Sequence, residues 1–148
     1  AAVVEPLGVL GIVAPDRQPL LGSVALLAPA IAMGNTVVLV PSSRAPLSMT
    51  DFYQVLETSD VPAGVVNIVT GDSLTLAKTL AEHDGVDGLW FLGSAEGSAM
   101  VEKASVGNLK QTWTSRGLAY DLAAPQFAGD YLLAKATQVK NVWIPYGA

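Results

Sequence analysis

Short β-branched runs alternate along the chain with longer segments of helical hydrophobic spacing. Parallel strands joined by crossover helices produce this alternation. The five runs with strand composition are Gly8–Val13, Thr36–Val40, Val65–Val69, Leu89–Leu92 and Leu109–Thr114. The segments with helical spacing between them are Leu20–Met33, Ser48–Thr58, Ser73–Glu82 and Ala95–Ala104. The sequence therefore predicts an α/β fold with a doubly wound, mostly parallel five-stranded sheet.

Local signals mark where the helices begin and end. Leu20–Met33 is apolar on nearly all sides and is followed by Gly34-Asn35, so we expect a buried helix with a glycine C-cap. Ser48-Met49-Thr50-Asp51 resembles a capping box, with Ser48 as the N-cap. Gly71-Asp72-Ser73 supplies turn and N-cap residues for the third helix.

The periodicity fades between Gly117 and Pro125. Beyond it, Tyr131–Ala136 is helix-like and Gln138–Ile144 has strand composition. We expect one domain over residues 1–125 and a tail over residues 126–148. The tail strand lies at the chain end with little left to pair with, which leaves pairing with another chain open.

Composition excludes several classes of partner. The chain carries a net charge of -5, and its eight Lys and Arg residues are scattered, so we expect neither nucleic acid nor an anionic membrane surface as a partner. The charge-free stretch Gln18–Ser43 is interrupted by Pro and Gly, and its apolar core Val24–Met33 is too short to span a bilayer. With no signal-peptide pattern and no cysteine, we expect a cytoplasmic location, and the missing initial Met leaves the native boundaries open.

The search for chemical motifs finds little. There is no Gly-x-Gly-x-x-Gly, no Walker loop and no serine nucleophile elbow. In a doubly wound sheet, ligands bind at the carboxyl ends of the strands, so Gly93-Ser94 is the natural phosphate-facing turn. Ser94 has a second interpretation as a helix N-cap retained for folding alone, and spacing by itself favours that one.

Several phrases nevertheless resemble the aldehyde dehydrogenase superfamily in sequence and order. These phrases are Glu5-Pro6-Leu7-Gly8-Val9, Pro29-Ala30, Gly34-Asn35-Thr36-Val37-Val38, Pro46-Leu47, Pro62-Ala63-Gly64-Val65-Val66-Asn67-Ile68-Val69, Phe91-Leu92-Gly93-Ser94 and Asn108-Leu109-Lys110. The resemblance covers Glu5 to Gly117 and implies a Rossmann-type domain that holds NAD or NADP. Of the family's cofactor-binding set, it leaves Phe91, Gly93, Ser94 and Gly71 in this chain.

Other cofactor positions depart from the family. The family's Lys-Pro-Ser-Glu holds the adenosine ribose through Lys and Glu, and the matching residues here are Val40 and Ser43. The family's Phe-Thr-Gly-Ser-Thr loses two hydroxyls, at Leu92 and Ala95. We therefore expect the remaining set to be vestigial and no cofactor to be bound, with NAD or NADP as the ligand if any binds.

The positions that the family uses for catalysis depart as well. Arg17, in Pro15-Asp16-Arg17, stands where the family has the oxyanion-hole Asn, a donor whose loss typically costs about 100- to 1,000-fold in turnover. Ser115 stands where the family has its Glu base, and a serine does not serve as a base unaided. The family's reaction also passes through a cysteine thiolate, and this chain has no Cys. We therefore assign no catalytic residue.

The remaining candidates have ordinary structural interpretations. His83, at a predicted helix end, is expected to be solvated or to interact with the helix dipole, and no second metal ligand is visible, so we assign no metal site. Asp16 and Arg17 are expected to form an exposed pair in a loop. Trp90, Trp113 and Trp143 are expected on strands, in the core or at an interface.

Two hypotheses about function follow from the resemblance. Thr137–Trp143 resembles the family's C-terminal tail, which belongs to the arm through which subunits assemble, and the whole pattern is similar to the degenerate second module of two-module (family sixteen) aldehyde dehydrogenases. The first hypothesis is a non-catalytic module for structure and assembly, whose partners are other modules or subunits, in a homo-oligomer. The second is a retained NAD(P)-binding domain with a regulatory or shared role.

Overall fold

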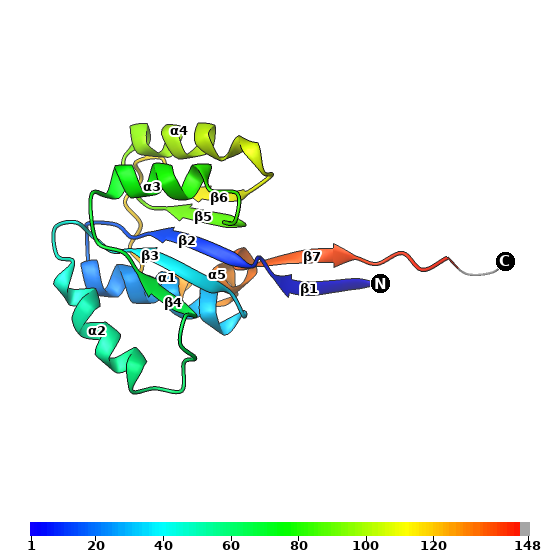
Figure 1. The fold of residues 1–148 in the computed structure, drawn as a ribbon, viewed down its shortest axis with the longest axis horizontal. Coiled ribbons are helices and arrows are strands. Elements are labelled where there is room, and N and C mark those ends of the chain that lie inside the picture. Colours follow the sequence, from blue (N-terminus) through cyan, green and yellow to red (C-terminus); the bar gives the residue numbers. More distant parts are fainter. Residues whose placement is uncertain (146–148) are drawn as a thin grey trace.

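A single open sheet lies at the centre of the fold, between two layers of helices (Figure 1). The computed structural model describes residues 1–145. The sheet has the strand order β4-β3-β2-β5-β6, and each neighbouring pair is parallel. Its strands are β2 (Val9–Val13), β3 (Thr36–Val40), β4 (Val66–Ile68), β5 (Gly88–Phe91) and β6 (Gln111–Thr114). The predicted α/β class and five-stranded parallel sheet are confirmed.

The helices cover both faces of the sheet. They are α1 (Pro19–Ala32), α2 (Leu47–Glu57), α3 (Ser73–Glu82), α4 (Ala95–Ala104) and α5 (Asp130–Lys135), with 3₁₀ turns at Ser105–Gly107 and Pro125–Phe127. Figure 1 shows α3 and α4 on one face and α1, α2 and α5 on the other. Side chains alternate along β2 accordingly: Leu10 and Ile12 join the core under α1, whereas Val13 joins the core under α3 and α4.

Two helix predictions are corrected. The first helix is buried on one face only, through Leu26, Leu27 and Ala30, while Leu20 is 46% exposed, because α1 lies flat on the sheet with solvent on its other side. Ser48 is not the N-cap of α2. That position belongs to Pro46 and has no side-chain cap, and the Ser48 hydroxyl donates to the Ala45 carbonyl at 2.8 Å instead. The helix starts one residue before Ser48 because Pro46 already has helical backbone angles.

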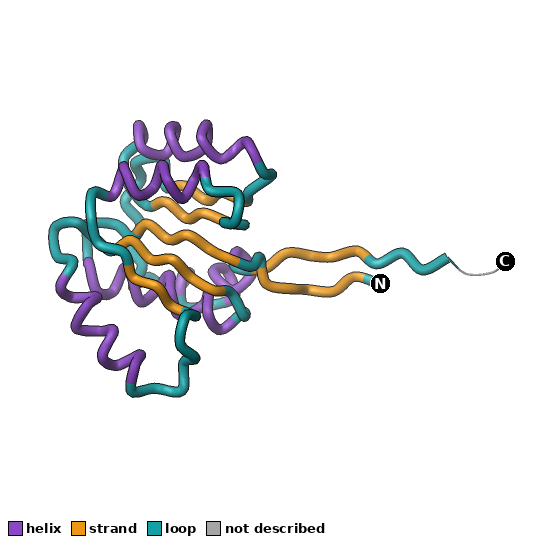
Figure 2. The backbone as a smooth tube through the Cα atoms, in the orientation of Figure 1, coloured by secondary structure: helices purple, strands orange, loops and turns teal. Residues whose placement is uncertain are grey.

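A two-stranded antiparallel ribbon leaves the body of the molecule (Figure 2). It pairs β1 (Ala2–Pro6) with β7 (Thr137–Asn141). The sequence does not predict β1. The expectation that little in this chain remains for the tail strand to pair with is wrong, because β1 pairs with it. The pairing joins residues about 135 positions apart, which no local pattern indicates. Trp143 lies beyond the end of β7 and is 90% exposed, so its predicted place on a strand is also wrong.

The segment between β6 and β7 folds back against the body. Trp113 of β6 stacks on Tyr120 with ring centroids 5.9 Å apart and meets Tyr131 edge-on at 6.0 Å. Leu132 of α5 is buried in the core under α1. The segment therefore contributes to the main core before the ribbon begins.

Candidate functional site

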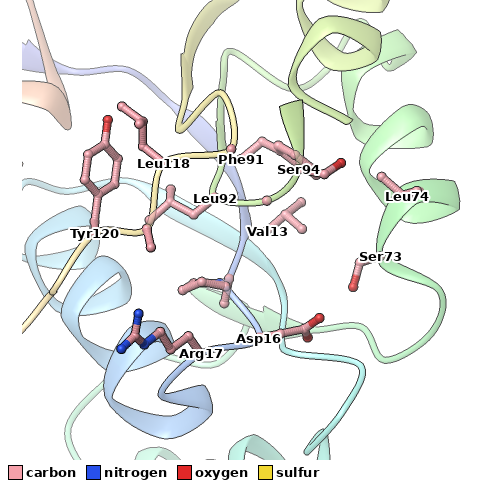
Figure 3. A pocket seen from close by; sticks show the side chains of 15 residues that line it. Val13, Asp16, Arg17, Ser73, Leu74, Phe91, Leu92, Ser94, Leu118 and Tyr120 are labelled. Atoms are coloured by element: carbon pink, nitrogen blue, oxygen red, sulfur yellow. The ribbon is translucent and has the colours of Figure 1, made fainter. Parts of the chain in front are cut away.

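A cleft of about 350 Å³ opens at the carboxyl ends of β2 and β5, where the chain's crossovers diverge to the two sides of the sheet. Ligands bind at this switch point in open α/β sheets. Its lining comes from the loop after β2, the first residues of α3, the turn between β5 and α4, and the loop after β6 (Figure 3). The lining residues are Val13, Ala14, Pro15, Asp16, Arg17, Ser73, Leu74, Phe91, Leu92, Gly93, Ser94, Gly117, Leu118, Ala119 and Tyr120.

Ser94 is the N-cap of α4. Its hydroxyl oxygen accepts a hydrogen bond from the Gly97 amide at 3.0 Å, and its carbonyl accepts one from the Ser98 hydroxyl at 2.9 Å. The capping geometry that spacing favoured is confirmed. A cofactor-binding role for Ser94 stays a prediction, although its side chain is exposed and lines the cleft.

The structure brings three of the four predicted cofactor residues together. Phe91 is 2% exposed, and its ring packs so closely on the turn that a Cβ placed on Gly93 would lie 2.6 Å from it. Phe91, Gly93 and Ser94 all line the cleft, whereas Gly71 is exposed in the turn before α3 and is not among the lining residues. The phenyl ring thus explains why residue 93 has no side chain.

The two positions that the resemblance assigns to ribose binding differ in their exposure to solvent. Val40 is buried in the core under α3 and α4, and Ser43 is exposed in the loop after β3. Neither belongs to the lining of the cleft.

Asp16 and Arg17 are exposed in the loop after β2, as predicted, but they do not pair with each other. No ion pair joins them among the residues that the structure describes, and the Asp16 carboxylate instead accepts a hydrogen bond from the fully buried Ser42 hydroxyl at 2.6 Å. In Figure 3 the two side chains point to opposite sides of the loop, and both line the cleft. Sequence reasoning missed Tyr120 and Leu118 because they reach the cleft through a loop with no periodic signal.

Ser115, at the position that the resemblance gives to the general base, is 2% exposed. Its hydroxyl donates to the Gly93 carbonyl at 3.0 Å, and its amide donates to the Phe91 carbonyl at 2.9 Å. These bonds fix the loop after β6 against the turn after β5. Ser115 therefore serves the architecture of the cleft.

A carboxylate beside this loop has a perturbed pKa. Glu102 of α4 accepts hydrogen bonds from the Thr114 hydroxyl at 2.6 Å and from Arg116 Nε at 3.1 Å. The bond from Thr114, and then that from Arg116, hold the pKa of Glu102 below its ordinary value of 4.5. The two bonds tie α4 to the end of β6.

We expect Glu102→Gln to lower the free energy of unfolding at neutral pH and to lower it progressively less as the pH falls below 4.5. Because the folded pKa lies below the unfolded one, Glu102 stabilises the fold above pH 4.5 and loses that contribution as pH falls through the folded value. Urea unfolding between pH 3 and pH 7 measures the difference. Glu57→Gln, which removes an exposed carboxylate with no ion pair among residues 1–145, is the control, and equal pH profiles for the two variants would contradict the prediction.

At the opposite end of the sheet, Lys110 is buried and donates to the His83 carbonyl at 2.8 Å and to the Val86 carbonyl. Burial lowers the pKa of Lys110, against the attraction of Asp84 and Asp87. His83 follows α3 and accepts a hydrogen bond from the Gly85 amide through Nδ1.

Within residues 1–145, no cluster of three or more His, Asp or Glu side chains could hold a metal ion, and no helix is long and apolar enough to cross a membrane.

Comparisons with known proteins agree with this geometry. A betaine aldehyde dehydrogenase of Bacillus subtilis is 38% identical over 107 residues, which are 72% of this chain and 22% of that protein. The NADP/NAD-dependent aldehyde dehydrogenase PuuC of Escherichia coli is 35% identical over 76% of this chain and 23% of its own length.

Solved structures show the same relationship. Aldehyde dehydrogenase C of Pseudomonas syringae, a mutant in complex with NAD⁺ and octanal, superposes with a TM-score of 0.74 at 35% identity, over 76% of this chain and 23% of that one. The glyceraldehyde-3-phosphate dehydrogenase GapN of Methanocaldococcus jannaschii, complexed with NADP, gives 0.70 at 31% identity over 76% and 25%. The chain spans about a quarter of the length of these relatives. The model of the aldehyde dehydrogenase family matches residues 1–117, and the chain belongs to this family.

Proposed function

We propose that this chain is a non-catalytic aldehyde dehydrogenase module that acts in structure and subunit assembly. The observation that carries the proposal is the absence of the reaction's groups: the sequence has no cysteine, and the residue matched to the base is a buried serine bonded to the Gly93 carbonyl. A thioester route needs a thiolate nucleophile and a base to activate it. We assign the chain to the degenerate second module of a two-module aldehyde dehydrogenase and to the cytoplasm.

The β1–β7 ribbon supports the assembly role. Val4 and Val139 form a direct cross-strand pair, and each is 61% exposed. The opposite face of the ribbon is mostly polar: Val3 lies there beside Glu5, which is bound by Lys140 at 3.4 Å and by Gln138 at 3.1 Å. A two-stranded ribbon alone is marginally stable in water, so a partner that covers its apolar face would stabilise it. On this proposal, the tail over residues 126–148 packs on the body through α5 and supplies β7 to assembly, and the partners are other modules or subunits.

Sedimentation velocity of the purified chain tests the assembly role. We expect concentration-dependent oligomers, with Val139→Lys weakening association by about tenfold or more, because a buried unpaired ammonium costs more than 1.4 kcal/mol. Val106→Lys places the same charge on an exposed valine of the body and is the control. A wild-type chain that is monomeric at all concentrations would contradict the assembly role.

A second candidate function is retained NAD(P) binding with a regulatory or shared role. The observation that favours it is the cleft at the switch point, with the exposed Ser94 hydroxyl at the N-terminus of α4. Calorimetric titration of wild type and Ser94→Trp with NAD and NADP tests it. Saturable binding that Ser94→Trp weakens would establish a cofactor site and overturn the purely structural proposal.

A further inference from the structure

Among the described residues that line the cleft, Asp16 supplies the carboxylate and Arg17 the guanidinium, and the carboxylate lies in the part of the fold where a dinucleotide would place its phosphates. Phosphates in open α/β sheets bind at helix N-termini beside the switch point. The helices whose first residues line this cleft are α3, through Ser73 and Leu74, and α4, through the N-cap Ser94. Asp16 lines the same cleft, and Figure 3 shows its carboxylate on the side of Ser73.

The Asp16 carboxylate is held in place by a hydrogen bond and forms no ion pair within residues 1–145. The Ser42 hydroxyl, which is fully buried, donates to Oδ1 of Asp16 at 2.6 Å and also accepts from the Arg44 amide at 3.2 Å, so the loops after β2 and β3 hold each other. Arg17 is the nearest basic residue in sequence, but its guanidinium points to the other side of the loop in Figure 3 and forms no ion pair with Asp16. Arg17 also lines the cleft, but Figure 3 shows the guanidinium on the opposite side of the loop from the carboxylate, which lies on the side of Ser73.

We propose that Asp16 excludes phosphate-bearing dinucleotides from this cleft and leaves it open to ligands without a phosphate, such as nucleosides. The inference deepens the non-catalytic assignment, on which it rests, because it names the residue that closes the cofactor site. A volume of 350 Å³ is on the order of 7 Å across, so a phosphate bound at the start of α3, on the side of the cleft where Figure 3 shows the carboxylate, lies near Asp16. At that separation, with an effective dielectric of about 20 and further solvent screening, each phosphate charge loses about tenfold to 50-fold in affinity.

Asp16→Asn tests the inference by a gain of binding. The amide removes the charge but keeps an oxygen that accepts from Ser42, so the loop is expected to retain its conformation. We expect the variant to bind NAD at least about tenfold more tightly than wild type by calorimetry, with the gain shrinking as ionic strength rises. Adenosine, an uncharged part of the dinucleotide, is expected to bind both proteins equally. Asp60→Asn removes an exposed carboxylate far along the chain and is the control for net charge.

The outcomes separate this inference from the proposed function. If neither wild type nor Asp16→Asn binds NAD, the Asp16 inference fails and the non-catalytic assignment stands. If wild type binds NAD as tightly as Asp16→Asn does, the inference fails together with the purely structural role. An equal gain in Asp60→Asn, or an equal gain for adenosine, would overturn the inference by showing that a charge fixed in the cleft is not the cause.

Discussion

Asn35→Ala is expected to lower the free energy of unfolding by about 2 to 4 kcal/mol, since the part-buried Gly8 amide and the buried Ala136 carbonyl each lose the side-chain partner that Asn35 supplies. Asn35 is 2% exposed. Its Oδ1 accepts from the Gly8 amide at 3.1 Å, and its Nδ2 donates to the carbonyls of Ala30 and Ala136, each at 2.9 Å. Ala30 lies in the last turn of α1, and Ala136 follows α5, so one side-chain amide bonds to carbonyls at two helix ends. The Ala30 carbonyl also accepts from the Asn35 backbone amide at 3.2 Å, a bond that the substitution keeps.

The same three bonds place Asn35 at the base of the ribbon. Gly8 follows β1, and Ala136 immediately precedes β7. We therefore expect Asn35→Ala to speed hydrogen exchange of the β1–β7 amides more than that of the central sheet. Urea unfolding gives the stability change, and exchange measured by mass spectrometry gives its location.

Asn67 provides a matched control for this prediction. Its side-chain amide also donates to two carbonyls, those of Gly64 at 2.8 Å and Val37 at 3.3 Å, but the residue is exposed. Water replaces these bonds, so Asn67→Ala is expected to cost less than about 1 kcal/mol. Asn35→Asp keeps the acceptor but loses both donors, and it is expected to be at least as destabilising as Asn35→Ala. Similar costs for Asn35→Ala and Asn67→Ala would refute the role of burial.

Local chemistry accounts for the elements that the sequence predicted. The N-cap Asp72 accepts from the Thr75 amide at 2.8 Å, as the turn before α3 indicates. Ser94 caps α4 in the same way. The strands of the parallel sheet have continuous β-branched sequences because helices cover both of their faces. Such a run is visible within each strand's own sequence.

The features that sequence reasoning missed depend on contacts between distant residues. Residues 2–6 form the strand β1 by pairing with β7, at the other end of the chain. The position of Asp16 as the carboxylate of the cleft depends on Ser42, which follows a different strand. Tyr120 lines the cleft because the chain turns back at Gly117, where the backbone φ of 81° suits glycine. Hydrophobic periodicity along the chain does not indicate contacts between residues that are distant in the sequence.

Trp90→Ala is expected to cost about 3 to 5 kcal/mol of stability, the usual range for removing a buried aromatic side chain. Trp90 lies in β5, is 2% exposed, and meets Trp113 edge-on with ring centroids 5.5 Å apart. Trp113 in turn contacts Tyr120 and Tyr131, and Lys135 lies 5.0 Å above its ring, so a cavity at Trp90 also loosens the segment that leads back to the ribbon.

Trp143→Ala removes the same side chain where it is 90% exposed, and is expected to change stability by less than about 0.5 kcal/mol. Thermal unfolding followed by near-ultraviolet circular dichroism measures both variants. If the Trp90→Ala protein were as stable as the Trp143→Ala protein, the aromatic cluster would not be what joins the segment between β6 and β7 to the sheet.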